Sequence, residues 1–257
     1  MPNSPASSNN IASPGSPGSP GSPVTVRCLG CGREFATEEV LLLGQTFAAE
    51  RYCDVCREGE KAEDEQRAAD ARWARVRVPS AYDGCSFETF EAVPDTATAL
   101  AVCRQWAREL RAGTDLRQGL LLRGNPGAGK THLAVAILRE LVWSERRKTA
   151  LFLNVPAWLN ALRESYGDGE PPPSPSGYDL VVLDDLGAED WSSWARDRIY
   201  NLVNQREQQR GLVIVTTNHD WGTLAGRVGG PTASRLRKLA REVHVDARDD
   251  FRARDAA

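Results

Sequence analysis

The sequence has no long apolar run and no recognisable secretion signal. Its 257 residues are 41% hydrophobic, slightly below the usual fraction for globular proteins. No stretch approaches the roughly 20 apolar residues that a transmembrane helix needs. The N-terminus also lacks the basic-then-apolar pattern of a signal peptide. We therefore expect a cytoplasmic protein that makes no membrane contact and keeps its cysteines reduced.

A strong charge of either sign is absent as well. The formal net charge is −3, so the molecule as a whole exerts no strong electrostatic attraction on nucleic acid. Any contact with DNA must come from a local cluster of lysine and arginine.

Composition divides the chain into five parts. Residues 1–23 are a Ser/Pro/Gly-rich leader with almost no apolar surface, which predicts disorder. Residues 24–57 contain four of the six cysteines. Residues 58–77 are rich in Ala, Glu and Arg and predict an exposed linker helix, which is either a solvated spacer or a docking helix for a partner. The main domain is expected at 78–245, followed by a C-terminal tail at 246–257.

The four N-terminal cysteines form two Cys-x-x-Cys pairs. Cys28 and Cys31 make the first pair, and Cys53 and Cys56 the second. Two such turns can present four thiolates tetrahedrally to one Zn²⁺, which would supply most of the folding energy of so small a module. Residues 34–50 between the pairs are expected to form a hairpin or a strand and turn. The alternatives are two disulfides, which a reducing compartment disfavours, or unreactive thiols.

A glycine-rich loop supplies the clearest chemical motif. Its residues, with the one that follows, are Gly124, Asn125, Pro126, Gly127, Ala128, Gly129, Lys130, Thr131 and His132. This G-x-x-x-x-G-K-[ST] spacing lets successive backbone N–H groups point at a triphosphate. Lys130 would reach the phosphate charge and the Thr131 hydroxyl would bind Mg²⁺. The alternative is a chance Gly-rich turn, but an apolar strand precedes the loop and a helix follows it.

Strands and helices alternate through the main domain. Apolar runs at 120–122, 150–154, 180–183 and 212–216 predict strands, with helices expected at 96–111, 131–146, 156–165 and 192–209. This alternation predicts an α/β fold with a parallel sheet flanked by helices on both faces. The strands are continuous apolar runs, as expected where both faces are covered. Cys85 and Cys103 lie alone and are expected to be ordinary buried thiols.

Polar residues follow two of these strands. Asp184 and Asp185 come after the strand at 180–183, at the end that lies beside a phosphate loop in an open parallel sheet. Asp184 is placed to bind Mg²⁺ and Asp185 to orient or deprotonate a water molecule. Asn218 follows the next strand and can bond to the γ-phosphate or that water. The alternatives are a solvated strand end for the acidic pair and an ordinary turn residue for Asn218.

A basic helix is predicted at 231–241. It carries Arg235, Arg237, Lys238 and Arg241. Such a helix is often only a solvated face. Alternatively, an arginine on it can enter the nucleotide site of a neighbouring subunit and stabilise transition-state charge.

The order of these elements resembles a known family. GNPGAGKTHLA, LVVLDDLG, VIVTTN and SRL occur in the order found in AAA+ ATPases of the bacterial replicative helicase-loader group. These are the DnaC/DnaI-type proteins, which have the transposition helper IstB as a relative. The resemblance covers about residues 78–245, and Ser86–Phe90 (SFETF) is similar to the segment that precedes the ATPase core. It implies a P-loop NTPase fold with a small N-terminal zinc-binding module.

The resemblance also implies roles for individual residues. Lys130 and Thr131 match Walker A, and Asp184 and Asp185 match Walker B. Asn218 matches sensor 1, and Arg235 matches an arginine finger that acts in trans within a homo-oligomer. Asp185 stands where glutamate is common, so slow hydrolysis is expected. No helical lid domain follows Arg241, which is typical of the loader group.

The implied activity is ATP-dependent loading of a DnaB-type helicase onto single-stranded DNA. ATP, Mg²⁺ and Zn²⁺ are the expected cofactors, and the zinc module of some members contacts the helicase. The sequence leaves two alternatives open. One is a transposition helper ATPase that serves a transposase. The other is a nucleotide-gated zinc-ribbon adaptor whose ATPase is degenerate. The leader and the Pro-rich segment at 167–177 have no assigned role.

Overall fold

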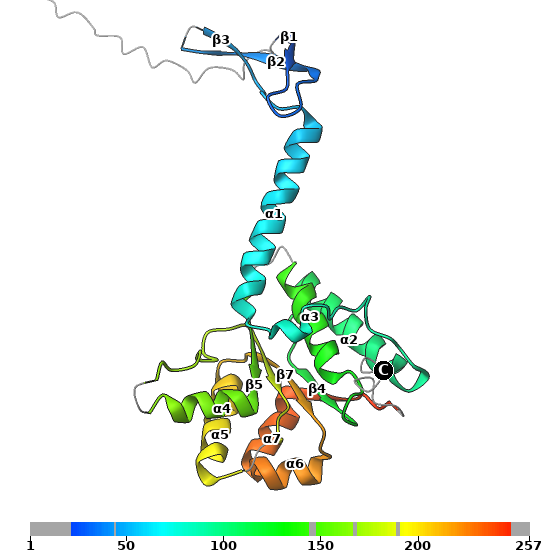
Figure 1. Cartoon of the computed structure of the whole chain (residues 1–257), viewed down its shortest axis with the longest axis vertical. Coiled ribbons are helices and arrows are strands. Elements are labelled where there is room, and N and C mark those ends of the chain that lie inside the picture. The colour runs from blue at the N-terminus through cyan, green and yellow to red at the C-terminus, as the bar shows by residue number, and fades with distance from the viewer. Residues whose placement is uncertain (1–21, 44, 144–147, 167–168, 189–190, 248–257) are drawn as a thin grey trace, which may run out of the picture. The chain divides into compact units, whose positions relative to one another are not determined.

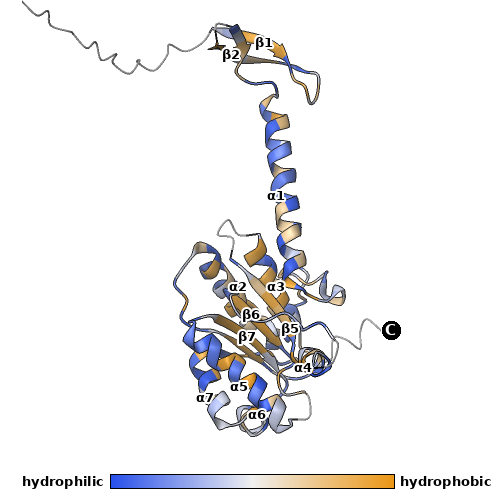
Figure 2. Cartoon of the chain, turned by 90° about the vertical axis from the view of Figure 1, so that its left-hand side faces the viewer, coloured by the Kyte–Doolittle hydropathy of each residue, from blue (hydrophilic) through white to orange (hydrophobic). Residues whose placement is uncertain are grey.

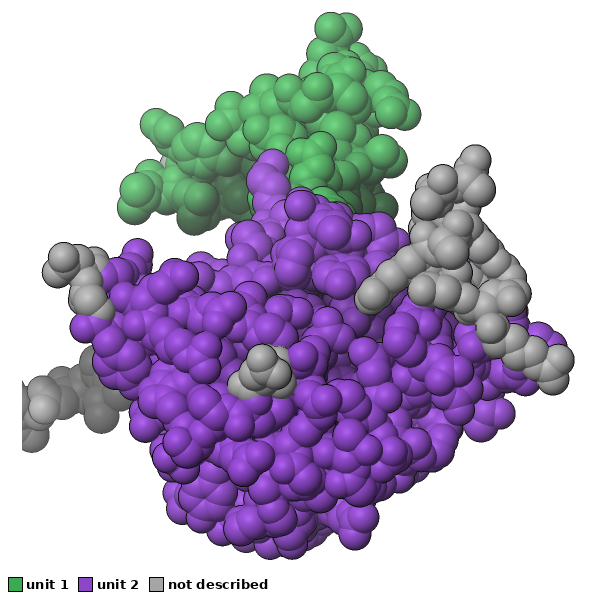
Figure 3. Space-filling model, turned by 60° about the horizontal axis from the view of Figure 1, so that its bottom comes forward, with its two compact units in different colours: residues 1–66 green, residues 67–257 purple. Residues whose placement is uncertain are grey.

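The computed structural model describes residues 22–43, 45–143, 148–166, 169–188 and 191–247 (Figure 1). The disorder expected of the leader therefore falls almost entirely outside the described residues, as does most of the expected tail. The chain forms two compact units, residues 1–66 and 67–257 (Figure 3). This division falls within one long helix, and the finer boundaries suggested by composition stay predictions.

The first unit is built on a small antiparallel sheet. Its strands are β1 (Pro23–Arg27), β2 (Glu34–Leu42) and β3 (Gln45–Ala48), in the order β1-β2-β3. β2 and β3 pair as a hairpin, the first of the two arrangements expected between the cysteine pairs. Helix α1 (Asp54–Val76) begins between Cys53 and Cys56. The first cysteine pair follows β1 directly, since β1 ends at Arg27.

A three-layer α/β/α arrangement forms the second unit. After a short 3₁₀ turn at Ser80–Tyr82, its helices are α2 (Pro94–Ala112), α3 (Lys130–Val142), α4 (Val155–Glu164), α5 (Ser193–Gln208), α6 (Trp221–Val228) and α7 (Gly230–Leu239). Its strands are β4 (Gly119–Arg123), β5 (Ala150–Asn154), β6 (Leu180–Asp184), β7 (Leu212–Thr217) and β8 (Ala240–His244). None of the helices in the described part of the chain is long and apolar enough to cross a membrane.

The five strands pair in parallel in the order β5-β6-β7-β4-β8. The predicted fold class, a parallel sheet flanked by helices, is confirmed. Because β7 lies between β6 and β4, the carboxyl ends of these three strands are neighbours. That order brings the phosphate loop after β4 next to the polar residues that follow β6 and β7.

Both faces of the sheet are buried, which explains the continuous apolar strands. Leu120 and Leu122 belong to the core beneath α2 and α3, whereas Leu121 points to the core beneath α4, α5, α6 and α7. In Figure 2 the strands of this unit are strongly hydrophobic, whereas α5 and α7 are largely hydrophilic. Of the two lone cysteines, Cys103 is fully buried as expected, but Cys85 is only half-buried.

The structure differs from the prediction in two respects after β7. The basic helix was expected to run to Arg241, but α7 ends at Leu239 and Arg241 lies in strand β8. In β8 only Ala240 and Val243 are buried, so its short mixed sequence carries no strong strand pattern. The strand forms because it pairs with the edge of β4, a long-range contact that periodicity does not reveal.

Candidate functional site

The phosphate loop connects β4 to the N-terminus of α3. Gly127 and Gly129 have φ of 73° and 89°, values that glycine adopts at little cost. A Cβ at Gly129 would lie 2.6 Å from the ring of Phe90, so packing also requires a glycine there. The loop thus ends on the positive end of a helix dipole, which favours anions.

Lys130 lies at the centre of this curved loop. Its side chain is nearly buried. Its Nζ donates to the carbonyl oxygen of Gly124 at 2.9 Å and to that of Asn125 at 2.6 Å. The ammonium group is therefore held against the concave backbone, where a bound phosphate would meet it.

Asp184 forms a buried hydrogen-bonded centre beside the loop. The Thr131 hydroxyl donates to its Oδ1 at 2.8 Å, and the Thr216 hydroxyl donates to the same oxygen at 2.7 Å. Its Oδ2 is buried with no hydrogen-bond partner within the described residues. Burial raises the pKa of the Asp184 carboxyl, so a cation nearby would stabilise its ionised form. A hydroxyl beside a carboxylate is a donor set that suits Mg²⁺, and these residues fit that ion.

Asp185 adopts a strained backbone conformation. Its φ is 55°, in the left-handed region that non-glycine residues rarely occupy. Its N–H donates to the Thr216 hydroxyl at 2.9 Å, which holds the turn in place. Strain maintained by the surrounding structure is typical of functional sites, where it aims a side chain.

These residues meet in one cleft of about 280 Å³ at the carboxyl ends of the strands. It is lined by Ala81, Tyr82, Cys85, Pro126, Gly127, Gly129, Lys130, Thr131, His132, Asp185 and Asn218. Asp184 lies behind Thr131, while Gly124, Asn125 and Ala128 form the rest of the loop without lining the cleft. The structure therefore brings the phosphate loop, the acidic pair and Asn218 together.

The segment before α2 was missed as part of the site. Ala81, Tyr82 and Cys85 line the cleft, although no local motif marks them. His132 links this region to the loop, because its Nε2 lies 2.7 Å from the Ser86 carbonyl oxygen and its ring packs edge-on against Phe90. The only sequence signal was the similarity of the SFETF segment to the lead-in of the loader group.

Arg235 does not line the cleft of its own chain. On α7 it forms an ion pair with Glu207 of α5 at 3.2 Å and stacks on the ring of Tyr200. It also donates to Asn204. Its role in trans stays a prediction.

The four N-terminal cysteines come together as predicted from their spacing. The sulfur atoms of Cys28, Cys31, Cys53 and Cys56 all lie within 4.8 Å of one another. Cys31 and Cys53 are 3.7 Å apart between sulfurs, too far for a disulfide of about 2.05 Å. Tetrahedral zinc with Zn–S bonds of about 2.3 Å places its sulfurs about 3.8 Å apart. The cluster therefore fits Zn²⁺, and its four cysteines are free thiols in this structure.

Backbone amides stabilise thiolate in this cluster. N–H groups of Cys31 and Cys53 point at the Cys28 sulfur and lower the pKa of that thiol to about 6. The Cys56 thiol donates its S–H to the sulfurs of Cys28 and Cys31, and this hydrogen bonding raises the pKa of Cys56 to about 12. A bound Zn²⁺ would take the place of that proton and allow all four sulfurs to ionise.

Comparison with known proteins identifies the family. The family described as "IstB-like ATP binding protein" matches residues 54–245. The chain belongs to this family. Among curated relatives, the replicative helicase loader DnaC of Escherichia coli is 25% identical over 169 residues, covering 63% of this chain and 67% of the relative. The loader DnaI of Bacillus subtilis is 33% identical over 98 residues, covering 37% of this chain and 31% of the relative.

Solved structures show the same fold. The crystal structure of the DnaC helicase loader gives a TM-score of 0.57 at 23% identity, covering 65% of this chain and 99% of that one. The crystal structure of DnaI gives 0.54 at 22% identity, covering 68% and 94%. This member of the IstB-like family therefore shares the fold of these structures, with a parallel sheet flanked by helices as predicted from its motifs.

Proposed function

We propose that this protein is an ATP-dependent helicase loader that delivers a DnaB-type helicase to single-stranded DNA. The observation that carries the proposal is the cleft in which Lys130, Asp185 and Asn218 converge, in a chain whose relatives include DnaC and DnaI. ATP binding and hydrolysis would set when the assembly forms and when it releases its cargo.

The geometry of the cleft supports a role for each of its main residues. Backbone amides of the loop and Lys130 would hold the β- and γ-phosphates, and Thr131 with Asp184 would hold Mg²⁺, which neutralises charge on the phosphates. Asp185 would orient the attacking water, with Asn218 bonded to that water or to the γ-phosphate. Asp184 is less suited to act as the base, because it is fully buried and does not line the cleft.

A transposition helper is the second candidate. A putative insertion sequence ATP-binding protein of Sinorhizobium fredii is 28% identical over 205 residues, covering 77% of this chain and 65% of the relative. That match spans more of this chain than the match to DnaC. The ATPase chemistry would be the same, and the partner would be a transposase.

An apolar hairpin on the first unit offers a surface for the partner. Leu41, Leu42 and Leu43 at the tip of the β2–β3 hairpin are exposed by 72%, 58% and 105%. Three adjacent exposed leucines form a contiguous apolar surface of the kind found at protein interaction sites. We assign the helicase contact to this hairpin.

The partner is tested by capture of purified proteins. With ATP present, the immobilised full chain should retain a purified DnaB-type helicase, and Leu41→Ser/Leu43→Ser should reduce retention at least tenfold because the apolar contact is lost. The matched control Val55→Ser changes another exposed apolar residue outside the hairpin. Retention of a purified transposase in place of the helicase would support the second candidate and overturn the first.

Replacing Asp185 by asparagine tests the water-activating role. Asparagine has the same shape and tolerates φ of about 55°, so the turn should persist. Phosphate release should fall about a hundredfold while ATP affinity stays within a few fold. Asp220→Asn, which changes an N-cap carboxylate of α6, is the control. If Asp185→Asn releases phosphate at the wild-type rate, another group orients the attacking water.

Arg235 is tested by mixing two inactive variants. Lys130→Ala lacks a working cleft but keeps Arg235, whereas Arg235→Ala keeps the cleft. If Arg235 acts in trans, mixed oligomers should recover part of the hydrolysis that each variant loses alone. Arg237→Ala, on the same helix, should retain full hydrolysis. If circular dichroism shows that both variants are folded and the mixture recovers no hydrolysis, Arg235 does not act in trans. Its role is then the structural one of contacting α5.

A further inference from the structure

A second, larger cavity lies at the opposite end of the sheet from the phosphate loop. Its volume is about 920 Å³, and it lies between the end of α1, α3 and the start of β5. The α1 residues that line it belong to residues 67–257, so the groove lies within one compact unit. Lys148 and Tyr178 precede β5 and β6, whereas the nucleotide cleft follows β4, β6 and β7. Nothing in the ATPase chemistry uses this groove.

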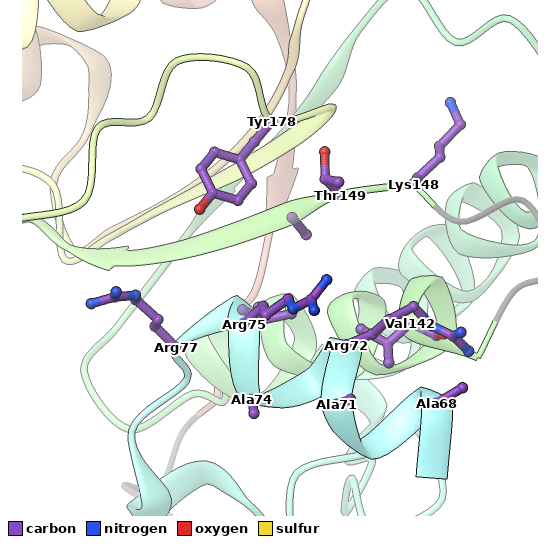
Figure 4. A pocket seen from close by; sticks show the side chains of 12 residues that line it. Ala68, Ala71, Arg72, Ala74, Arg75, Arg77, Val142, Lys148, Thr149 and Tyr178 are labelled. Carbon is purple, nitrogen blue, oxygen red and sulfur yellow. The ribbon is translucent and has the colours of Figure 1, made fainter. Parts of the chain in front are cut away.

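The walls of the groove are strongly basic. Arg72, Arg75 and Arg77 come from α1 and its end, and Lys148 and Tyr178 come from the facing side (Figure 4). No aspartate or glutamate is among the described residues that line it. In a chain with a net charge of −3, this is the kind of local cationic cluster that an anionic polymer requires.

Three of these cations have no partner in the described part of the chain. Arg72 donates to the Val142 carbonyl oxygen at 2.8 Å, but Arg75, Arg77 and Lys148 make no side-chain hydrogen bond or ion pair there. Arg77 has φ of 64°, a conformation in which glycine is the usual residue after a helix. Arg77 lines the groove in spite of this backbone strain (Figure 4).

We propose that this groove binds a single strand of nucleic acid, with Arg75, Arg77 and Lys148 on its phosphates and Tyr178 stacked on a base. A cationic groove combined with an aromatic ring is how single strands are held without sequence preference. An acidic peptide would also satisfy the cations, because clusters of arginine recognise acidic motifs. The ring of Tyr178 among the lining residues favours a nucleic acid instead, because a base stacks on such a ring and an acidic side chain does not. The proposal rests on the loader function above and names its DNA-contacting surface.

The test is the salt dependence of oligonucleotide binding. A fluorescent oligothymidylate is titrated with the full chain and ATP at several salt concentrations, with anisotropy as the readout. Arg75→Gln/Arg77→Gln should weaken binding about tenfold or more and reduce the slope of log K against log salt by about 1.4, because each lost phosphate contact removes about 0.7. Tyr178→Leu should weaken binding about tenfold with the slope unchanged.

Arg108→Gln/Arg241→Gln is the matched control. It removes two exposed charges on α2 and β8, outside the groove, and should leave affinity and slope unchanged. The groove proposal fails, and the loader function stands, if the groove variant binds the oligonucleotide as tightly as the wild type does. The same conclusion holds if the control variant loses as much affinity as the groove variant. If the groove variant no longer retains the helicase but still binds the oligonucleotide with wild-type affinity, the groove binds an acidic protein surface and the proposal fails. If the wild type binds no oligonucleotide, both proposals fail. Measured ATP binding would still show whether the cleft is a nucleotide site.

Discussion

Lys130→Ala is expected to lower ATP hydrolysis by about a hundredfold or more. The Lys130 ammonium lies against the carbonyl oxygens of Gly124 and Asn125 at the centre of the loop. In the complex with ATP it would stabilise charge that grows on the phosphates as the γ-phosphoryl bond breaks, and losing one such group costs about two to three orders of magnitude in rate. The measurements are phosphate release and the affinity for a fluorescent ATP analogue, which should also fall.

Lys238→Ala is the control for this prediction. Lys238 is an exposed lysine of α7 that pairs with Glu207 at 2.6 Å, and an exposed pair contributes little to stability. This variant should hydrolyse ATP at the wild-type rate. Wild-type hydrolysis by folded Lys130→Ala would contradict the assignment of the cleft as an ATPase site, and loading that still requires ATP would contradict the loader mechanism.

Removing zinc is expected to unfold the first unit and leave the second folded. Metal analysis of the full chain should find about one zinc per chain. A strong chelator should then abolish hydrogen-exchange protection in β1, β2 and β3, because metal binding contributes about 10–16 kcal/mol to modules of this kind. Protection in β4, β6 and β7 should persist, since those strands lie in a separate core.

Single cysteine variants make the zinc prediction specific. Cys28→Ser should lose zinc, because it removes one of the four sulfurs of the cluster. Cys85→Ser changes a cysteine outside the cluster and should keep it. Zinc-free protein with four titratable thiols and a protected β1–β3 sheet would contradict the metal site.

Several features of the chain could be predicted because each depends on residues that are close together in the sequence. The phosphate loop depends on glycines at fixed spacing, and a buried parallel strand reads as a continuous apolar run. The Cys-x-x-Cys spacing predicted a cluster that the sulfur positions now match. In each case a short stretch of sequence determines the feature, so that stretch is enough to predict it.

Other features depend on contacts between distant segments. β8 carries little pattern of its own and exists because it pairs with β4. Cys85 and Tyr82 line the cleft only because the chain before α2 passes beside the phosphate loop. The contacts of Arg235 with α5 follow from the packing of α7, which no motif reports.

The sequence by itself determined the α/β class, the nucleotide loop, the acidic pair and the cysteine pairs. Tertiary structure decided which of these meet. The strand order places β7 between β4 and β6, and that order alone brings Asn218 to Lys130 and Asp185. The same packing gathers Arg75, Arg77, Lys148 and Tyr178 around one groove. Chain positions far apart in sequence become neighbours through burial of both sheet faces, which is a property of the whole core and of no single segment.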